Sequence, residues 1–141
     1  HVVCRRQRQM CIRDSNRTIN TKINLDKFNT YAVGAAQQSG RLSIPNIDKL
    51  IHLKDRSNIV SGKTVLMFDE NLKGIHLSQA KIKPNSEILV VIGPEGGFEE
   101  EERAFISDSS KNFFNVSLGP NILKADTAVI AALSLTFHYF S

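Results

Sequence analysis

The chain contains no long apolar run, and its cysteines and histidines are few. A membrane-spanning helix needs roughly 18 consecutive apolar residues, and no stretch reaches that length. The first residues also lack the apolar segment of a secretory signal. The two cysteines form no metal site on their own, and the histidines lack the spacing of metal ligands. The four histidines are His1, His52, His76 and His138. We therefore expect a cytoplasmic protein without a membrane partner or a metal.

Two widespread nucleotide-binding motifs are also absent. The glycine-rich stretch Gly93–Gly97 lacks G-x-G-x-x-G spacing, and no acidic residue follows a strand about 20 residues later. The stretch is not a G-x-x-x-x-G-K-[ST] loop either, which excludes a P-loop nucleotidase. A dinucleotide-dependent dehydrogenase is accordingly a poor interpretation. The chain has no internal repeat and no low-complexity segment.

Length and charge indicate one nearly neutral domain. The 141 residues, of which 41% are hydrophobic, are enough to form a single core. The net charge of +4 is unevenly distributed, because residues 1–15 carry four arginines against one aspartate. The rest of the chain has 14 basic and 13 acidic side chains. Composition alone therefore does not make the folded part an RNA-binding protein.

The basic N-terminal segment shows neither a helical nor a strand period. It holds both Cys4 and Cys11, and a disulfide between them is not expected in a cytoplasmic protein. One interpretation is an arm that contacts phosphates. The interpretation that we favour is a non-native or disordered leader over residues 1–18, followed by one folded domain over residues 19–141.

The rest of the chain alternates predicted helices with short apolar runs. Helices are predicted over 25–38, 45–54, 76–82, 98–109 and 126–140. Strands are predicted over 64–68, 87–92 and 113–118. Asp126 is a plausible N-cap of the last helix. Because the strands are apolar on both faces, the pattern indicates an α/β fold with a mostly parallel sheet and helices on both sides.

Ligands of such sheets bind beyond the carboxyl ends of the strands, so the loops there are the expected place for chemistry. These loops are Asp69-Glu70, Gly93–Gly97 and Gly119–Lys124. In the second loop, three glycines permit a close backbone approach to a ligand, although a simple tight turn would have the same composition. In the third loop, the apolar pair Ile122 and Leu123 either covers a flat group such as adenine or fills the core beneath the loop.

Three segments together resemble a known family. They are AAQQSGR (35–41), IGPEGGF (92–98) and VSLGPNILKADTA (116–128). In this order they are similar to the ribosomal RNA small-subunit methyltransferase E family, which belongs to the SPOUT superfamily. The resemblance covers about residues 19–141. It implies a C-terminal trefoil knot, and it implies methyl transfer from S-adenosylmethionine to N3 of a uridine in small-subunit (16S) ribosomal RNA.

The resemblance also implies which residues act. The cofactor would be held by Phe68, Gly93, Pro94, Glu95, Gly96, Gly97, Leu118, Gly119, Ile122, Leu123, Thr127 and Ala128. The catalytic candidates are Arg41, Glu95, Lys124 and Asp126. N3 of uracil must lose a weakly acidic proton, so a base or a nearby positive charge is needed. Arg41 could instead be a solvated arginine, Glu95 a partner of the helix dipole, and Lys124 and Asp126 a cap with an exposed ion pair.

The sequence departs from the family in two respects. Many members have Arg-Thr-Glu at positions 124–126, where this chain has Lys-Ala-Asp, and lysine lacks the planar fork of arginine. Family members also begin with a barrel-like RNA-binding domain, which nothing here resembles, so we expect weak binding to ribosomal RNA. A homodimer through the knot and the last helix is expected. A related enzyme acting on transfer RNA, or a non-catalytic cofactor-binding or dimerisation module, is the alternative.

Overall fold

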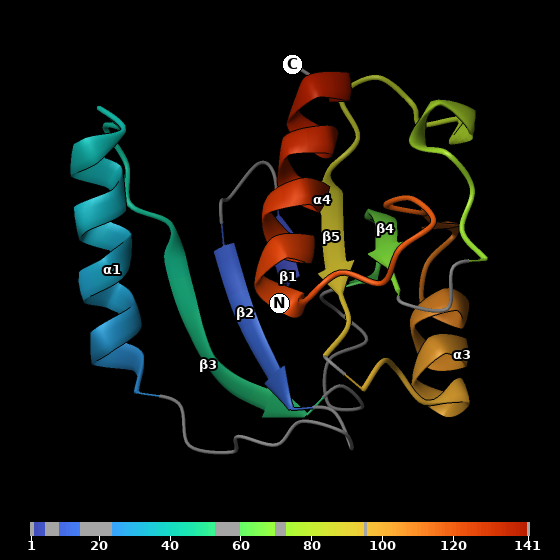
Figure 1. Cartoon of the computed structure of the whole chain (residues 1–141), viewed down its shortest axis with the longest axis horizontal. Coiled ribbons are helices and arrows are strands. Elements are labelled where there is room, and N and C mark those ends of the chain that lie inside the picture. The colour runs from blue at the N-terminus through green and yellow to red at the C-terminus, as the bar shows by residue number, and fades with distance from the viewer. Residues whose placement is uncertain are drawn as a thin grey trace.

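The computed structural model describes residues 2–4, 9–14, 24–52, 60–69, 73–94 and 96–140. At its centre is a six-stranded sheet with the order β3-β2-β1-β5-β4-β6 (Figure 1). The strands are β1 (Val2–Cys4), β2 (Gln9–Asp14), β3 (Asn46–His52), β4 (Thr64–Phe68), β5 (Ile88–Ile92) and β6 (Asn112–Asn115). The helices are α1 (Leu25–Gln38), α3 (Glu100–Asp108) and α4 (Ala125–Phe140), with a 3-10 turn η2 (Leu77–Gln79).

The sheet is mostly parallel, as predicted. β4 pairs in parallel with both β5 and β6, and β2 pairs in parallel with β3. β1 is antiparallel to its two neighbours, β2 and β5. Every strand except β1 therefore runs in the same direction, and the ends of β4, β5 and β6 meet at one edge of the sheet.

The two central parallel strands, β4 and β5, are buried on both faces. Alternate side chains point to opposite sides, so that Val65 and Met67 pack with Ile106 of α3. Leu66 and Phe68 pack in a second cluster that contains Ala132 of α4. Figure 1 shows α4 lying across one face of the sheet beside β5. The predicted layer of helices on each face is confirmed.

The helix boundaries follow from local capping. Asn24 precedes α1 and its side chain accepts a hydrogen bond from the Lys27 amide at 3.1 Å. α3 begins with a capping box, in which the Glu99 amide donates to Glu102 Oε2 at 2.9 Å. α4 starts at Ala125, one residue earlier than predicted. Asp126 is therefore inside the first turn, and its prediction as the N-cap was wrong.

Two predictions about the N-terminal half were also wrong. Residues 45–54 were expected to form a short helix, but β3 covers most of them. Residues 1–18 were expected to lack regular structure, but they contain β1 and β2. In both places the pairing partner is distant in sequence, since β3 pairs with β2 and β1 pairs with β5. Short apolar runs do not reveal such partners, and pairing overrides local preference.

Smaller differences concern the connections. The helix predicted over 76–82 is reduced to the 3-10 turn η2. The strand predicted over 113–118 ends at Asn115, and Val116 continues it only as an isolated parallel bridge with Ile75. Within the described ranges, no helix has both the length and the apolar character needed to cross a membrane.

Candidate functional site

The ends of β4 and β5 are joined to the segment that follows β6. The Gly93 amide donates a hydrogen bond to the Phe68 carbonyl at 3.3 Å, and the Val116 amide donates to the Met67 carbonyl at 2.8 Å. These bonds connect the ends of three parallel strands. The loops that leave the strands therefore lie next to one another, as the parallel sheet requires.

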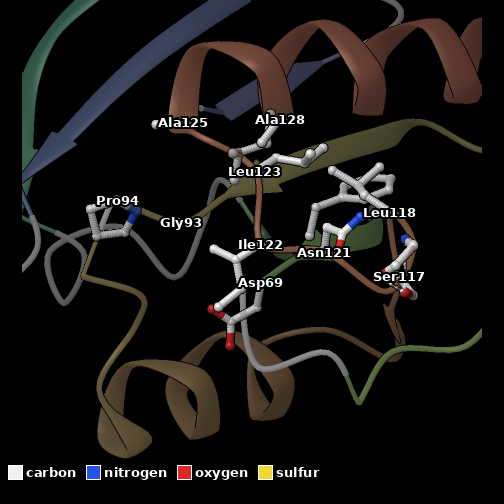
Figure 2. Close-up of a pocket in the computed structure, with 13 residues that line it drawn as sticks. Asp69, Gly93, Pro94, Ser117, Leu118, Asn121, Ile122, Leu123, Ala125 and Ala128 are labelled. Atoms are coloured by element: carbon white, nitrogen blue, oxygen red, sulfur yellow. Dashed lines mark hydrogen bonds between the residues drawn. The ribbon is translucent and has the colours of Figure 1, made fainter.

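A pocket opens between these loops and the start of α4 (Figure 2). The space within it amounts to about 500 Å³, a figure that includes the open mouth. Thirteen residues line it: Phe68, Asp69, Ile92, Gly93, Pro94, Ser117, Leu118, Gly119, Asn121, Ile122, Leu123, Ala125 and Ala128. Most contribute apolar side chains or glycine backbone. The pocket thus suits a ligand with a flat apolar part and a few polar groups.

The segment after β6 is shaped by backbone contacts with residues 74–75. The Ile75 amide donates to the Asn115 carbonyl at 2.8 Å, and the Ser117 amide donates to the Ile75 carbonyl at 2.9 Å. The chain then turns at Gly119, which has a φ of 118°. Because side chains rarely adopt this conformation, glycine is the residue suited to this turn. The Gly119 amide donates to Ser117 Oγ at 3.1 Å, which completes the turn.

The structure brings eight of the predicted cofactor residues into this pocket. They are Phe68, Gly93, Pro94, Leu118, Gly119, Ile122, Leu123 and Ala128. Gly96, Gly97 and Thr127 do not line it. Glu95 lies outside the described residues. Ile122 is 63% exposed, so it lies at the surface and does not fill the core.

Five lining residues were not named as cofactor residues from the sequence. They are Asp69, Ile92, Ser117, Asn121 and Ala125. Asp69 belongs to the loop that was expected to carry chemistry, because it directly follows a buried strand. The other four adjoin predicted site residues, and their neighbourhood was the available signal. Without the path of the turn after β6, the sequence did not show which of them line the pocket.

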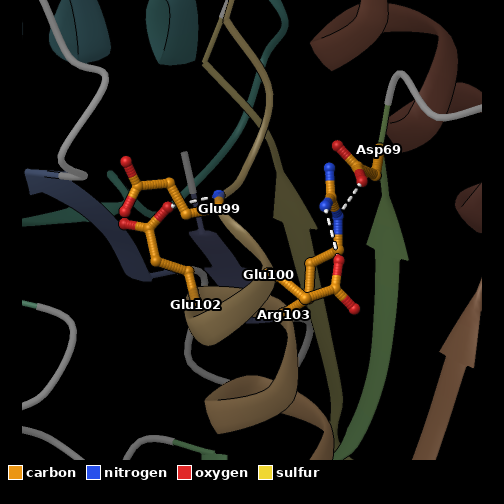
Figure 3. A network of polar contacts seen from close by, with 5 residues as sticks. All are labelled: Asp69, Glu99, Glu100, Glu102 and Arg103. Carbon is orange, nitrogen blue, oxygen red and sulfur yellow. Dashed lines mark hydrogen bonds and ion pairs between the residues drawn. The ribbon is translucent and has the colours of Figure 1, made fainter.

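Asp69 belongs to a charged network with residues of α3 (Figure 3). Arg103 Nε donates to Asp69 Oδ2 at 2.6 Å, and Arg103 Nη1 donates to Glu100 Oε2 at 3.3 Å. The Asp69 side chain is fully buried, whereas Glu100 is almost fully exposed. The hydrogen bond to Asp69, reinforced by the charges of both carboxylates, raises the pKa of Arg103 above its usual value.

Of the predicted catalytic residues, the three that the structure describes, Arg41, Lys124 and Asp126, do not line the pocket. Arg41 lies in the connection between α1 and β3, at the edge where β3 begins. Because β3 runs in the same direction as β5, this edge is opposite to the one with the pocket. Lys124 and Asp126 are exposed beside the pocket. Asp126 Oδ1 accepts hydrogen bonds from the Thr127 amide at 2.7 Å and from Thr127 Oγ1 at 3.4 Å.

The structure shows whether Lys124 and Asp126 form an ion pair and whether possible metal ligands cluster. Among the described residues, no ion pair joins Lys124 to Asp126. No cluster of three or more histidine, cysteine, aspartate or glutamate residues is placed to hold a metal ion in the described part of the chain. The arrangement can therefore bind a small molecule through apolar surfaces and backbone groups.

Comparison with known proteins identifies relatives over nearly the whole chain. The family model described as "RNA methyltransferase domain" matches residues 8–136. Ribosomal RNA small subunit methyltransferase E of Rickettsia conorii is 32% identical over 115 residues, which are 79% of this chain and 46% of that protein. The chain therefore spans about half the length of the curated relatives that it matches.

Solved structures share the fold. A putative methyltransferase from Legionella pneumophila, described in complex with the bound cofactor SAM, superposes with a TM-score of 0.73 at 28% identity. The match covers 92% of this chain and 55% of that one. Ribosomal RNA small subunit methyltransferase E from Neisseria gonorrhoeae, bound to S-adenosyl methionine, has a TM-score of 0.68, 23% identity and the same coverage of both chains. At that identity the second match supports the fold alone.

Proposed function

This chain belongs to the RNA methyltransferase domain family, and on that premise we propose that it transfers a methyl group from S-adenosylmethionine to N3 of a uridine in small-subunit (16S) ribosomal RNA. The observation that carries the proposal is the pocket at the ends of β4 and β5, which eight of the expected cofactor residues line. The proposed place of action is the cytoplasm.

The residues of the pocket fit the cofactor. Ile122 and Leu123 offer apolar surface for the adenine ring, and the glycines at 93 and 119 leave backbone groups accessible to polar atoms. When bound, the cofactor supplies an activated methyl group, so the protein has mainly to bind and orient its substrates.

The role of the chain is to hold uridine N3 in line with that methyl group and to help remove its proton. Arg41, Glu95, Lys124 and Asp126 remain the proposed catalytic residues. Lys124 and Asp126 are exposed next to the pocket, where an RNA substrate could reach them. A positive charge near a uracil carbonyl would stabilise the negative charge that grows there as the proton leaves.

We propose a homodimer because Arg41 lies at the edge of the sheet opposite to its own pocket. If Arg41 acts in catalysis, it must reach the pocket of a second copy. α4 offers apolar surface for such contact, since Ile130, Phe137 and Tyr139 are 71%, 46% and 42% exposed. Exposed large apolar side chains on one helix are typical of protein interfaces.

We also propose that the C-terminal segment forms the trefoil knot of the SPOUT superfamily. In support, residues 115–117 pair with Ile75, and the chain then passes close to β4 and β5 before α4 begins. Gly74 allows this contact, because a Cβ there would lie only 2.5 Å from the Val116 carbonyl carbon. An experimental trace of residues 69–76 and 116–125 would show directly whether one segment threads the other.

Methyl transfer can be tested with cofactor that carries a deuterated methyl group. The chain would be incubated with small ribosomal subunits, 16S ribosomal RNA and transfer RNA, and the digested RNA analysed by mass spectrometry. We expect labelled 3-methyluridine in the ribosomal RNA. Label in transfer RNA would favour the alternative that the chain is a related methyltransferase acting on transfer RNA. Cofactor binding without label in any RNA would favour a non-catalytic cofactor-binding or dimerisation module.

A further inference from the structure

One wall of the pocket is a turn that makes few hydrogen bonds to the rest of the chain. The residues of this turn that line the pocket are Ser117, Leu118, Gly119, Asn121, Ile122 and Leu123. Figure 2 shows the segment leading into α4. Residues 120–122 are exposed, so their position depends on how the two ends of the turn are fixed.

The start of the turn is fixed to the sheet, and its end is fixed to α4. The Ser117 amide donates a hydrogen bond to the Ile75 carbonyl at 2.9 Å. The next bond between backbone groups along the chain joins the Ala128 amide to the Lys124 carbonyl, at 2.8 Å in the first turn of α4. Between these two points, the hydrogen bonds that the described residues make all join the Ser117 hydroxyl to Gly119.

The hydroxyl of Ser117 binds both polar backbone groups of Gly119. Ser117 Oγ accepts a hydrogen bond from the Gly119 amide at 3.1 Å and donates one to the Gly119 carbonyl at 3.3 Å. Gly119 has a φ of 118°, and beyond its chain neighbours no described atom lies within 4 Å of the place where a Cβ would stand. Packing therefore does not impose this conformation. Because glycine has more backbone freedom than any other residue, the two hydrogen bonds are what favours one conformation here.

We infer that Ser117 is a positioning residue, whose hydroxyl holds the turn at Gly119 in its binding form before the cofactor arrives. The inference rests on the proposed cofactor site. A turn that is already ordered loses less conformational freedom when a ligand binds, and this raises the affinity. If the binding form is populated only part of the time, the apparent Kd rises in proportion. Ser117 acts through Gly119 and needs no contact of its own with the ligand.

The test uses three substitutions at position 117 and one control. Ser117→Ala removes the hydroxyl. Ser117→Thr keeps it, and Ser117→Val has the shape of threonine without it, so this pair isolates the hydroxyl even if the alanine variant does not fold. The control is Ser86→Ala, since Ser86 Oγ donates to the Lys83 carbonyl at 2.7 Å in a turn that does not line the pocket.

Two quantities would be measured for each variant. The mobility of the Gly119 amide in the ligand-free chain follows from NMR order parameters and relaxation dispersion. The Kd of S-adenosylhomocysteine follows from isothermal titration. Only the first quantity is independent of the ligand, so it separates the ordering of the turn from direct contact with the cofactor.

In Ser117→Ala and Ser117→Val we expect a mobile Gly119, with its order parameter falling from about 0.85 to below about 0.6 or with new exchange on the millisecond timescale. The Kd of S-adenosylhomocysteine should rise about tenfold, as it would if the binding form fell to roughly one tenth of the population. Ser117→Thr and Ser86→Ala should match the wild type in both measurements.

Three results would overturn the inference. Lost affinity with a rigid Gly119 would mean that the hydroxyl contacts the ligand itself. A mobile Gly119 with unchanged affinity would mean that binding does not need the ordered turn. Equal behaviour of Ser117→Thr and Ser117→Val would mean that side-chain shape matters and the hydroxyl does not. If the folded wild type bound no S-adenosylhomocysteine, the proposed function would fail and the inference with it, whereas the three results above all require a wild type that binds.

Discussion

Individual residues at the pocket contribute either exposed side-chain surface or backbone geometry, and the structure separates these two contributions. Ile122 lines the pocket but is 63% exposed, so the fold does not depend on its burial. Position 119 has a φ of 118° in the turn after β6, and glycine adopts this conformation more easily than other residues. A substitution at Ile122 should therefore change ligand binding without changing stability.

We predict that Ile122→Ala weakens the binding of S-adenosylmethionine about tenfold, because it removes apolar surface that the adenine ring would cover. The free energy of unfolding should change by less than about 0.5 kcal/mol. Ile44→Ala is the control, since Ile44 is 55% exposed in the connection between α1 and β3. Calorimetric titration and denaturant unfolding would measure both effects. Equal binding by the two variants would contradict the assignment of Ile122 to the ligand.

At this scale the sequence predicted eight of the residues that line the pocket. Its glycine motifs identified the residues whose backbone shapes the pocket. Gly96 and Gly97 were named as part of the glycine-rich loop, and Thr127 as part of the start of the last helix, but the pocket lining does not include them. The ion pair between Asp69 and Arg103 was not predicted, because its partners are 34 residues apart and meet only when α3 packs on the sheet.

At the scale of secondary-structure elements, the contact between residues 74–75 and 116–117 fixes the position of the segment after β6, which lines the pocket. A Cβ on Gly74 would overlap the Ser117 amide nitrogen and lie 3.0 Å from the Val116 carbonyl oxygen. Both atoms belong to the backbone, so neither can move aside like a flexible side chain. Gly74 was not singled out from the sequence, because the sequence does not show which distant backbone atoms a glycine in a connection will contact.

We predict that Gly74→Ala lowers the free energy of unfolding by about 1–3 kcal/mol, the usual cost of overpacking. It should also weaken cofactor binding, because the segment after β6 would shift. Gly34→Ala is the matched control: nothing lies within 4 Å of its would-be Cβ in α1, and alanine favours the helix by about 1 kcal/mol. Thermal or denaturant unfolding would measure the change in the free energy of unfolding for both variants. A Gly74→Ala variant as stable as wild type would show that the close approach is not required.

The same scale explains which elements the sequence could predict. The strand over 64–68 and the helix over 25–38 were predicted with the bounds that the structure has, because burial on both faces and capping are local signals. β1, β2 and β3 were missed because their pairing depends on partners far along the chain. A short apolar run before pairing is equally compatible with helix and strand.

For the molecule as a whole, the proposed dimer explains why Arg41 and the pocket occupy opposite edges of the sheet. We predict that Ile130→Glu converts the dimer to a monomer, since a charge would replace a large apolar side chain on the exposed face of α4. Ala104→Glu, at an exposed position of α3, is the control for adding a charge to a helix. Analytical ultracentrifugation would distinguish the two. A dimer that persists in Ile130→Glu would exclude this face of α4 as the interface.

RNA binding also belongs to the scale of the whole molecule. The chain spans about half the length of its curated relatives, and outside residues 1–15 its charge is nearly balanced. We expect weak binding to 16S ribosomal RNA, with a Kd in the micromolar range or above, as is typical when few phosphate contacts form. Fluorescence anisotropy at fixed salt would measure it. Nanomolar binding would mean that this chain alone supplies the recognition surface.

The central claim is that the cofactor lies in the pocket between the ends of β4 and β5 and the segment after β6. The most direct measurement is a crystal structure of the chain with S-adenosylhomocysteine. We predict electron density between Gly93 and Pro94 on one side and the turn from Leu118 to Leu123 on the other. Density at another place, or an empty pocket at saturating ligand, would contradict the claim.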